Sequence, residues 1–226
     1  MSTFALFAVF SWLMGSTAGR MALLAVVLWY LDNRYTGWLA ALWAPVARAQ
    51  RISSLRRTVD VNPSDVRAMV ELGEHYLKAG KYPTALEYLE RAMARGEDGP
   101  RATYLHGAVL IKLGRHAEGR ARIEAALAQQ PNTAFGEPYI YLLEEALATA
   151  GAQSARVESL VAEFEHFDGV EVLTRAGRLC AAGGRKDLAK RLLEEAIHNY
   201  GFIPKKMRRR ERHWMVRARL GLMQLG

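Results

Sequence analysis

The sequence contains little of what redox, metal or disulfide chemistry requires. Its 226 residues include one cysteine, Cys180, which excludes an intramolecular disulfide and any CxxC zinc or redox motif. The six histidines form no HExxH or HxH motif and no metal-spaced cluster with the cysteine. The sequence also lacks the GxxxxGK[ST], GxSxG and GxGxxG loops that bind phosphates or carry a nucleophilic serine. These absences argue against an enzyme and predict no catalytic residue, no metal site and no cofactor.

One half of a metal-binding motif is present. Glu163 and His166 have the ExxH spacing that di-iron helix bundles use in two copies. Because the sequence contains no second copy, we interpret these two residues as a pair on the surface of a helix.

Charged residues are nearly absent from the start of the chain, where residues 1–31 contain only Arg20. Two apolar blocks of 11 residues, 4–14 and 21–31, are joined by GSTAGR. A helix needs about 20 residues to cross the hydrocarbon layer, so neither block spans a membrane alone. The region is therefore predicted to be a hydrophobic membrane anchor, as either one tilted helix or a re-entrant hairpin of two short helices. A cleaved signal peptide is disfavoured because the positively charged leader is missing.

Aromatic and basic residues follow the apolar blocks. Five aromatic residues lie between positions 29 and 43, and five arginines lie between positions 34 and 57. Aromatic residues gather at the membrane–water interface, and basic residues flank the cytoplasmic side of a membrane segment. We therefore predict an interfacial aromatic and basic linker helix over 32–62, with the rest of the chain on the cytoplasmic side.

The remainder of the chain lacks long runs of Val, Ile or Thr and is rich in Ala, Leu, Glu and Arg. This composition predicts an all-α body. Residues 59–204 hold 17 basic and 21 acidic residues, whereas residues 205–226 hold eight basic residues and one acidic residue. A mildly acidic body is therefore followed by a strongly basic segment.

Two stretches of the body are near repeats. AGKYPTALEYLERA is echoed 34 residues later by LGRHAEGRARIEAA, with apolar residues at helical spacing on both sides of each turn. Gly80 and Gly114 fall where one helix would end and the next begin. Small residues recur at positions 8, 20 and 27 of a 34-residue unit: Gly73, Ala85 and Ala92 in the first copy, and Gly107, Gly119 and Ala126 in the second.

This pattern resembles the tetratricopeptide repeat, and the chain resembles membrane-anchored bacterial proteins of that family. The resemblance implies an α-solenoid of stacked helix pairs over 63–204, in which small residues let paired helices approach closely. The predicted units are 66–99, 100–132, 137–169 and 170–203. The third is the weakest, because Glu144 and Arg156 replace small residues. Cys180 occupies an apolar slot of the fourth unit and is interpreted as part of the core.

Residues 205–226 are predicted to form a basic helix that caps the solenoid. Trp214, Met215, Leu220 and Met223 are expected to cover the last repeat. The cations of this segment could bind anionic lipid headgroups or nucleic acid. Because Trp214 is the only interleaved aromatic, nucleic acid is the less favoured of the two. The candidate basic patch is Lys205, Lys206, Arg208, Arg209, Arg210 and Arg212.

The resemblance also implies a concave groove lined by the first helix of each pair, which would bind a partner protein or peptide. Arginine and tyrosine are good anchors for such a partner. The groove residues predicted from the repeat positions are Arg67, Lys78, Arg101, Tyr104, Lys112, Tyr141, Arg175 and Arg178.

The predicted function is a scaffold or adaptor, anchored in a bacterial inner membrane, that captures a partner protein on its cytoplasmic face during assembly of a membrane complex. One alternative is a periplasm-facing factor of envelope or cytochrome biogenesis, as in other anchored proteins with these repeats. A second alternative is a lipid- or nucleic-acid-binding module that acts through residues 205–219.

Overall fold

The computed structural model describes residues 17–31, 38–149 and 154–225, and the secondary structure of these ranges is entirely helical. The chain divides into two compact units, residues 1–45 and residues 46–226. The predicted all-α fold is confirmed for the described residues.

The first unit contains α2 (Thr17–Leu31), a helix of 15 residues. Apolar side chains such as Met21, Leu24 and Val27 are exposed on it. Within the described residues, no helix combines the length and the apolar character that a membrane span requires. The predicted N-terminal membrane segment is therefore not supported, and the part of that prediction that concerns residues 1–16 lies outside the described residues.

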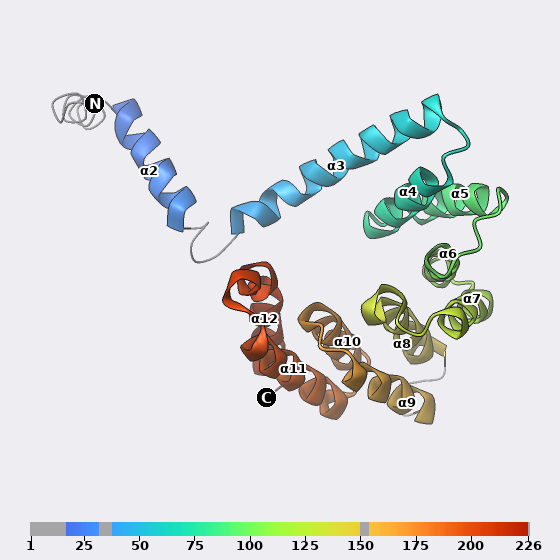
Figure 1. Ribbon diagram of the computed structural model, residues 1–226. Coiled ribbons are helices and arrows are strands. Elements are labelled where there is room, and N and C mark those ends of the chain that lie inside the picture. The colour runs from blue at the N-terminus through green and yellow to red at the C-terminus, as the bar shows by residue number, and fades with distance from the viewer. Residues whose placement is uncertain (1–16, 32–37, 150–153, 226) are drawn as a thin grey trace. The chain divides into compact units, whose positions relative to one another are not determined.

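The second unit is a row of antiparallel helix pairs (Figure 1). It begins with the C-terminal part of α3 (Trp38–Val61). The pairs are α4 (Val66–Lys78) with α5 (Tyr82–Met93), α6 (Pro100–Lys112) with α7 (His116–Gln129), α8 (Glu137–Thr149) with α9 (Ala155–Glu163), and α10 (Val170–Ala182) with α11 (Lys186–Phe202). Short 3-10 turns lie at Thr133–Gly136 and Phe164–His166, and α12 (Lys205–Leu225) follows the last pair.

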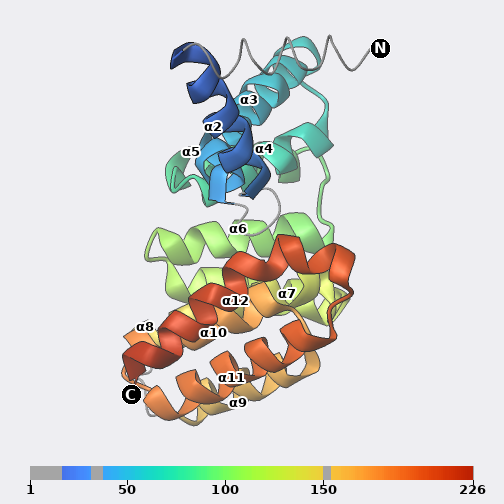
Figure 2. The ribbon, with the colours of Figure 1, turned by 90° about the vertical axis from the view of Figure 1, so that its left-hand side faces the viewer.

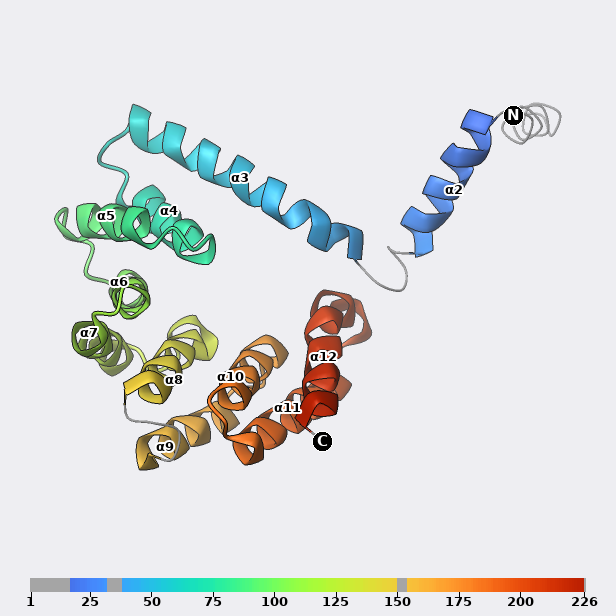
Figure 3. The same ribbon diagram turned by 180° about the vertical axis from the view of Figure 1, so that it is seen from behind.

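The first helices of the pairs form the inner row of this unit, and the second helices form the outer row (Figures 1 and 3). Each first helix has 13 residues. Gly80, Gly114 and Gly184 close the turn between the two helices of three pairs with φ of 74°, 82° and 81°. Only glycine adopts this left-handed backbone without strain, which explains the glycine in each turn.

Small residues set the distance between paired helices, as the repeat pattern predicts. A Cβ atom added to Gly107 of α6 would lie 2.6 Å from the carbonyl oxygen of Gly119 on α7. A Cβ added to Gly73 would lie 2.5 Å from the Leu89 side chain, and one added to Gly177 would lie 2.8 Å from Leu193. A side chain at Gly107 would clash with the backbone of α7, and a side chain at Gly73 or Gly177 would require the facing leucine to shift.

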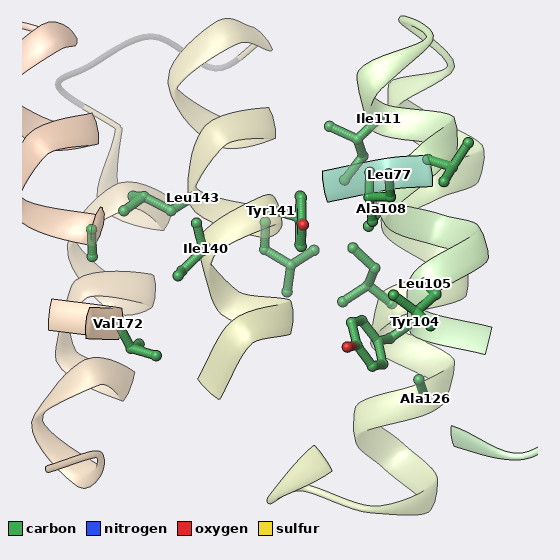
Figure 4. Close-up of a cluster of buried hydrophobic side chains, with 14 of the residues drawn as sticks. Leu77, Tyr104, Leu105, Ala108, Ile111, Ala126, Ile140, Tyr141, Leu143 and Val172 are labelled. Carbon is green, nitrogen blue, oxygen red and sulfur yellow. The ribbon is translucent and has the colours of Figure 1, made fainter. Parts of the chain in front are cut away.

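The core runs continuously through the inner row. α6 is buried on nearly all sides, from Ala102 to Ile111, because it packs against α7 as well as the neighbouring first helices. Figure 4 shows Tyr104 and Ile111 on one side of this junction and Tyr141 of α8 on the other, while Ile140 lies on the far side of α8, toward Val172. The inner row is therefore held together by apolar contacts beneath its polar surface.

The C-terminal cap packs through only part of the predicted set of residues. Trp214, Ala218 and Leu222 of α12 pack against the core, and Met215 is half-buried, whereas Leu220 and Met223 are exposed. The expectation that Leu220 and Met223 cover the last repeat is therefore wrong. Gly221 lies on the packed side of the helix, where a Cβ added to it would lie 3.0 Å from the Leu193 side chain of α11.

Candidate protein-interaction surface

The polar surface of the inner row is made by charged side chains at one-turn spacing. On α10, Glu171, Arg175 and Arg178 lie at i, i+4 and i+7, so they share one face of the helix. Equivalent charged positions occur on α4, α6 and α8. We call this surface the inner face and define it by Arg51, Arg67, Glu71, Glu74, Lys78, Arg101, Lys112, Glu137, Glu144, Glu171, Arg175 and Arg178.

At the N-terminal end of the inner face, Glu74 joins two helices. Its carboxylate accepts a hydrogen bond from Lys78 at 2.6 Å on its own helix and another from Arg101 on α6. Burial alone would raise the pKa of Glu74, but the hydrogen bonds and charges of Lys78 and Arg101 outweigh it and lower the pKa. Two of the predicted groove cations are therefore tied to the same carboxylate.

Glu71 makes a similar junction one turn earlier. Its carboxylate lies 2.8 Å from Arg51 of α3 and 3.7 Å from Arg67 of α4. Arg67 is highly exposed and its contact is the longer one, so it is the more available of the two cations.

The middle of the inner face is held by Lys112. Its ammonium group lies 2.5 Å from Glu144 of α8 and 6.0 Å from the centre of the Tyr141 ring. Glu144 occupies a position where the repeat pattern has a small residue. In this protein the glutamate instead forms an ion pair between two neighbouring first helices.

Glu137 connects three helices. One of its carboxylate oxygens accepts a long hydrogen bond of 3.5 Å from the Tyr104 hydroxyl of α6, and the other lies 3.4 Å from Arg175 of α10. Arg175 also lies 3.6 Å from Glu171 on its own helix. Most of the predicted groove cations are therefore joined to a carboxylate, and several of these ion pairs link adjacent repeats.

The two predicted tyrosine anchors belong to the core. The exposed fraction is 2% for Tyr104 and 5% for Tyr141, and burial raises the pKa of both hydroxyls. Their rings support the inner face from below and leave little surface for a partner. The predicted residues that present charge at the surface are Arg67, Lys78, Arg101, Lys112, Arg175 and Arg178.

Arg178 differs from the other inner-face cations. It is exposed on α10 and forms no ion pair with any described residue. Its guanidinium group can therefore bind a carboxylate of another molecule without breaking a bond within the fold.

The predicted basic patch on α12 divides into two groups. Arg208 donates hydrogen bonds to the carbonyl oxygens of Ile203 at 2.7 Å and Gly201 at 2.6 Å, where its charge is favourable beside the C-terminal end of α11. Its role is structural. Lys205, Lys206, Arg209 and Arg210 are exposed, Arg212 is half-exposed, and these five make no ion pair with the described residues.

Reactive groups are not assembled in the part of the chain that the structure describes. These residues contain no cluster of three His, Cys, Asp or Glu side chains that could hold a metal ion. Cys180 is fully buried, and burial raises the pKa of its thiol to about 11, so the nucleophilic thiolate is scarce at neutral pH. Glu163 and His166 are both exposed.

The sequence profile described as the tetratricopeptide repeat matches residues 76–136. This stretch is therefore similar to tetratricopeptide repeats. It spans α6 and α7 entirely and the parts of the neighbouring pairs on either side. No curated protein matches the sequence.

One solved structure has a similar fold over most of this chain, and others match less well. The crystal structure of a tetratricopeptide repeat protein from Parabacteroides merdae matches with a TM-score of 0.56 at 14% identity, covering 84% of this chain and 70% of that chain. MamA matches with a TM-score of 0.46 at 16% identity, covering 66% of this chain and 85% of its own. YrrB, described as a TPR protein with an unusual peptide-binding site, matches with a TM-score of 0.44 at 18% identity, covering 77% and 88%. The first of these supports a tetratricopeptide-like solenoid over most of this chain.

Proposed function

We propose that this protein is a scaffold that captures a partner protein on the inner face of its tetratricopeptide-like solenoid. The observation that carries the proposal is the row of charged side chains along the first helices, which ends at the exposed Arg178, a cation with no ion pair to any described residue. Stacked helix pairs hold such a row in fixed positions, so an extended segment of the partner can be bound at several points at once.

The bound segment is expected to carry acidic side chains. Arg178 offers guanidinium N–H donors, as do the sides of the Arg67 and Arg101 guanidinium groups that face solvent. The parallel N–H groups of an arginine suit the two oxygens of a carboxylate. Arg101 already forms an ion pair with Glu74 of the neighbouring repeat. It can therefore orient a partner while the fold stays intact. Arg178 has no such tie and is the stronger anchor.

The first test is photo-crosslinking in cells. A photoreactive amino acid placed at Arg178 on the inner face is compared with one placed at Lys186, an exposed residue at the start of α11 on the outer row. We expect a discrete crosslinked partner from position 178 and none of the same mass from position 186. Equal adducts from both positions would overturn the inner face as the capture site.

A charge variant then tests the chemistry. Arg178→Glu is expected to abolish capture of the same partner, because it repels acidic side chains and breaks no described ion pair. Lys186→Glu makes the same change of charge and favours the N-terminal end of α11, so it serves as the matched control. Charge reversal at Arg101 or Lys112 would be less informative, because each would face Glu74 or Glu144 and strain the fold itself.

The proposal includes attachment to the cytoplasmic side of a bacterial inner membrane through the N-terminal region. Support comes from the apolar sequence of residues 1–31 and from the exposed apolar side chains of α2. Cell fractionation followed by protease treatment of spheroplasts tests both points. Digestion of the helical repeats from outside would favour the periplasm-facing alternative, and full recovery in the soluble fraction would remove the anchor from the proposal.

A further inference from the structure

The outermost face of α12 carries apolar side chains that the fold leaves uncovered. Val216, Leu220 and Met223 are all exposed, and the relative solvent exposure of Met223 is 79%. A capping helix normally turns a polar face outward, because no further repeat covers it. These three residues lie at i, i+4 and i+7, so they form one stripe along the C-terminal half of the helix.

Unpaired cations surround this stripe. Lys205 and Arg209 continue it toward the N-terminal end of α12. At about 100° per residue, Arg212 and Arg219 lie along one flank and Lys206 and Arg210 along the other. None of these six side chains forms an ion pair with a described residue, and Arg217 stacks over Trp214 at 4.8 Å.

The opposite side of the C-terminal half of the helix packs on the body. Ala218, Leu222 and Leu225 face the body, and the Arg208 guanidinium is engaged by the end of α11. Figure 2, turned to show the left-hand side of Figure 1, shows α12 in front, running beside α10 and α11, which it contacts along its length. The stripe and its flanking cations therefore form a surface presented away from these contacts.

We propose that this outward face of α12 docks on an anionic lipid surface, with Val216, Leu220 and Met223 entering the headgroup region and the flanking cations bound to lipid phosphates. This proposal goes beyond partner capture on the inner face and does not depend on it. A narrow apolar stripe between two rows of long basic side chains is the arrangement of a helix that lies in the membrane interface. The basic side chains can extend their apolar stems beside the stripe and keep their charges at the phosphates.

Charge and geometry favour lipid over the other occupants. A second copy of the chain would bring α12 against α12 and oppose like charges in either orientation. A single acidic helix would reach only part of the surface, because the cations extend over roughly half the circumference of α12. A lipid surface engages both flanks at once. Nucleic acid would leave the apolar stripe unused, and no exposed aromatic side chain of α12 is free to stack on a base.

A fluorescent probe on α12 tests the proposal in the full-length chain. Cys180 is buried and reacts slowly, so Met223→Cys introduces one accessible thiol that can carry an environment-sensitive dye. Ser159→Cys on α9, which is exposed on the outer row, carries the same dye as the matched control. Because each signal is local, binding through residues 1–31 does not mimic docking of α12.

Phosphatidylcholine vesicles with about one-third phosphatidylglycerol are compared with phosphatidylcholine alone. We expect a blue shift and a several-fold rise in emission from the dye at position 223 on the anionic vesicles only, and no change at position 159. The signal should be lost in about 1 M salt, where the Debye length is about 3 Å. Arg209→Gln combined with Arg212→Gln should lower the apparent affinity for the anionic vesicles roughly 30-fold. Each basic residue near an anionic surface contributes about a factor of five to that affinity.

Three outcomes would overturn the proposal. The first is an unchanged dye at position 223 while the chain sediments with anionic vesicles, which would assign lipid binding to another region. The second is an equal response to neutral vesicles, which would remove the role of the cations. The third is a response to RNA or to polyglutamate at concentrations where anionic vesicles give none, which would assign the face to another polyanion. Helical circular dichroism of each variant should match that of the unmodified chain, because the substituted side chains face solvent.

Discussion

The carboxylate of Glu137, at the start of α8, lies 3.4 Å from the guanidinium group of Arg175 on α10. The same carboxylate accepts a hydrogen bond from the buried Tyr104 hydroxyl on α6, so one side chain links three consecutive repeats. Glu137→Ala should lower the stability by about 1–2 kcal/mol, because it leaves the Tyr104 hydroxyl and part of Arg175 without a partner. For a chain of this size the melting temperature should fall by roughly 2–8 °C, measured by circular dichroism.

Arg178→Gln is the control for this change. Arg178 lies on the same face of α10 as Arg175 but forms no ion pair with a described residue, so its replacement should alter the stability by less than about 0.5 kcal/mol. Equal effects of Glu137→Ala and Arg178→Gln would show that the bridge between repeats adds nothing to the fold.

The contact between Gly107 and Gly119 gives a second prediction. A Cβ at position 107 would lie 2.6 Å from the Gly119 carbonyl oxygen, and a backbone atom cannot move aside cheaply. Gly107→Ala should therefore destabilise the protein by about 1–3 kcal/mol, measured by urea denaturation. Gly201→Ala on α11 makes the same substitution where nothing lies within 4 Å of the added atom, and should be neutral or stabilising by up to about 1 kcal/mol.

These glycines also show how far the sequence predicts the fold. Small residues at fixed positions in a 34-residue period encode the close approach of paired helices, and that contact involves neighbours in sequence. The pairing of Arg101 with Glu74, or of Lys112 with Glu144, depends on the offset between adjacent repeats in the superhelix. The sequence does not specify that offset. It therefore predicts which cations lie on the inner face but not which carboxylates pair with them.

The cap illustrates the same limit. The sequence predicts Trp214, Met215, Leu220 and Met223 together on the packed side, but Trp214 packs against the core while Leu220 and Met223 are exposed. The packed side is set by Ala218 and Gly221, which allow α12 to lie close to α10 and α11. Small residues on one face of a basic helix are the signal that would have identified the packed side.

The third helix pair contains a buried ion cluster. Glu145 of α8 is 1% exposed, and its carboxylate lies 3.3 Å from Arg156 of α9 and 3.6 Å from Arg120 of α7. Arg156→Leu should destabilise the protein by about 2–4 kcal/mol, because the buried carboxylate loses its nearer cation. Urea denaturation measures the change.

The double variant Arg156→Leu with Glu145→Leu separates charge from packing. Replacing a buried pair by apolar residues is often close to neutral, so the second substitution should restore most of the stability that the first removes. A double variant as unstable as Arg156→Leu alone would mean that packing of the Arg156 side chain, and not its charge, stabilises the α8–α9 pair.

His106 makes the stability depend on pH. Burial in α6 lowers its pKa below the ordinary value of 6.5, with the charge of Arg122 acting in the same direction, so the folded protein holds the ring neutral. The unfolded chain therefore binds the proton first, and the stability should fall as the pH drops below 6.5. His106→Leu should give a flatter dependence of the free energy of unfolding between neutral pH and the folded pKa. Because burial lowers the pKa of His75 as well, some slope should persist.

Urea denaturation at several pH values measures this slope, with His166→Leu as the control. His166 is exposed after α9, so its replacement should leave the slope as it is in the unmodified protein. The Nδ1 atom of His106 has no hydrogen-bond partner among the described residues, so the leucine variant should also be at least as stable as the unmodified protein at acidic pH. An unchanged slope in His106→Leu would mean that the ring takes up its proton without disturbing α6, and that the buried histidine has a route to solvent.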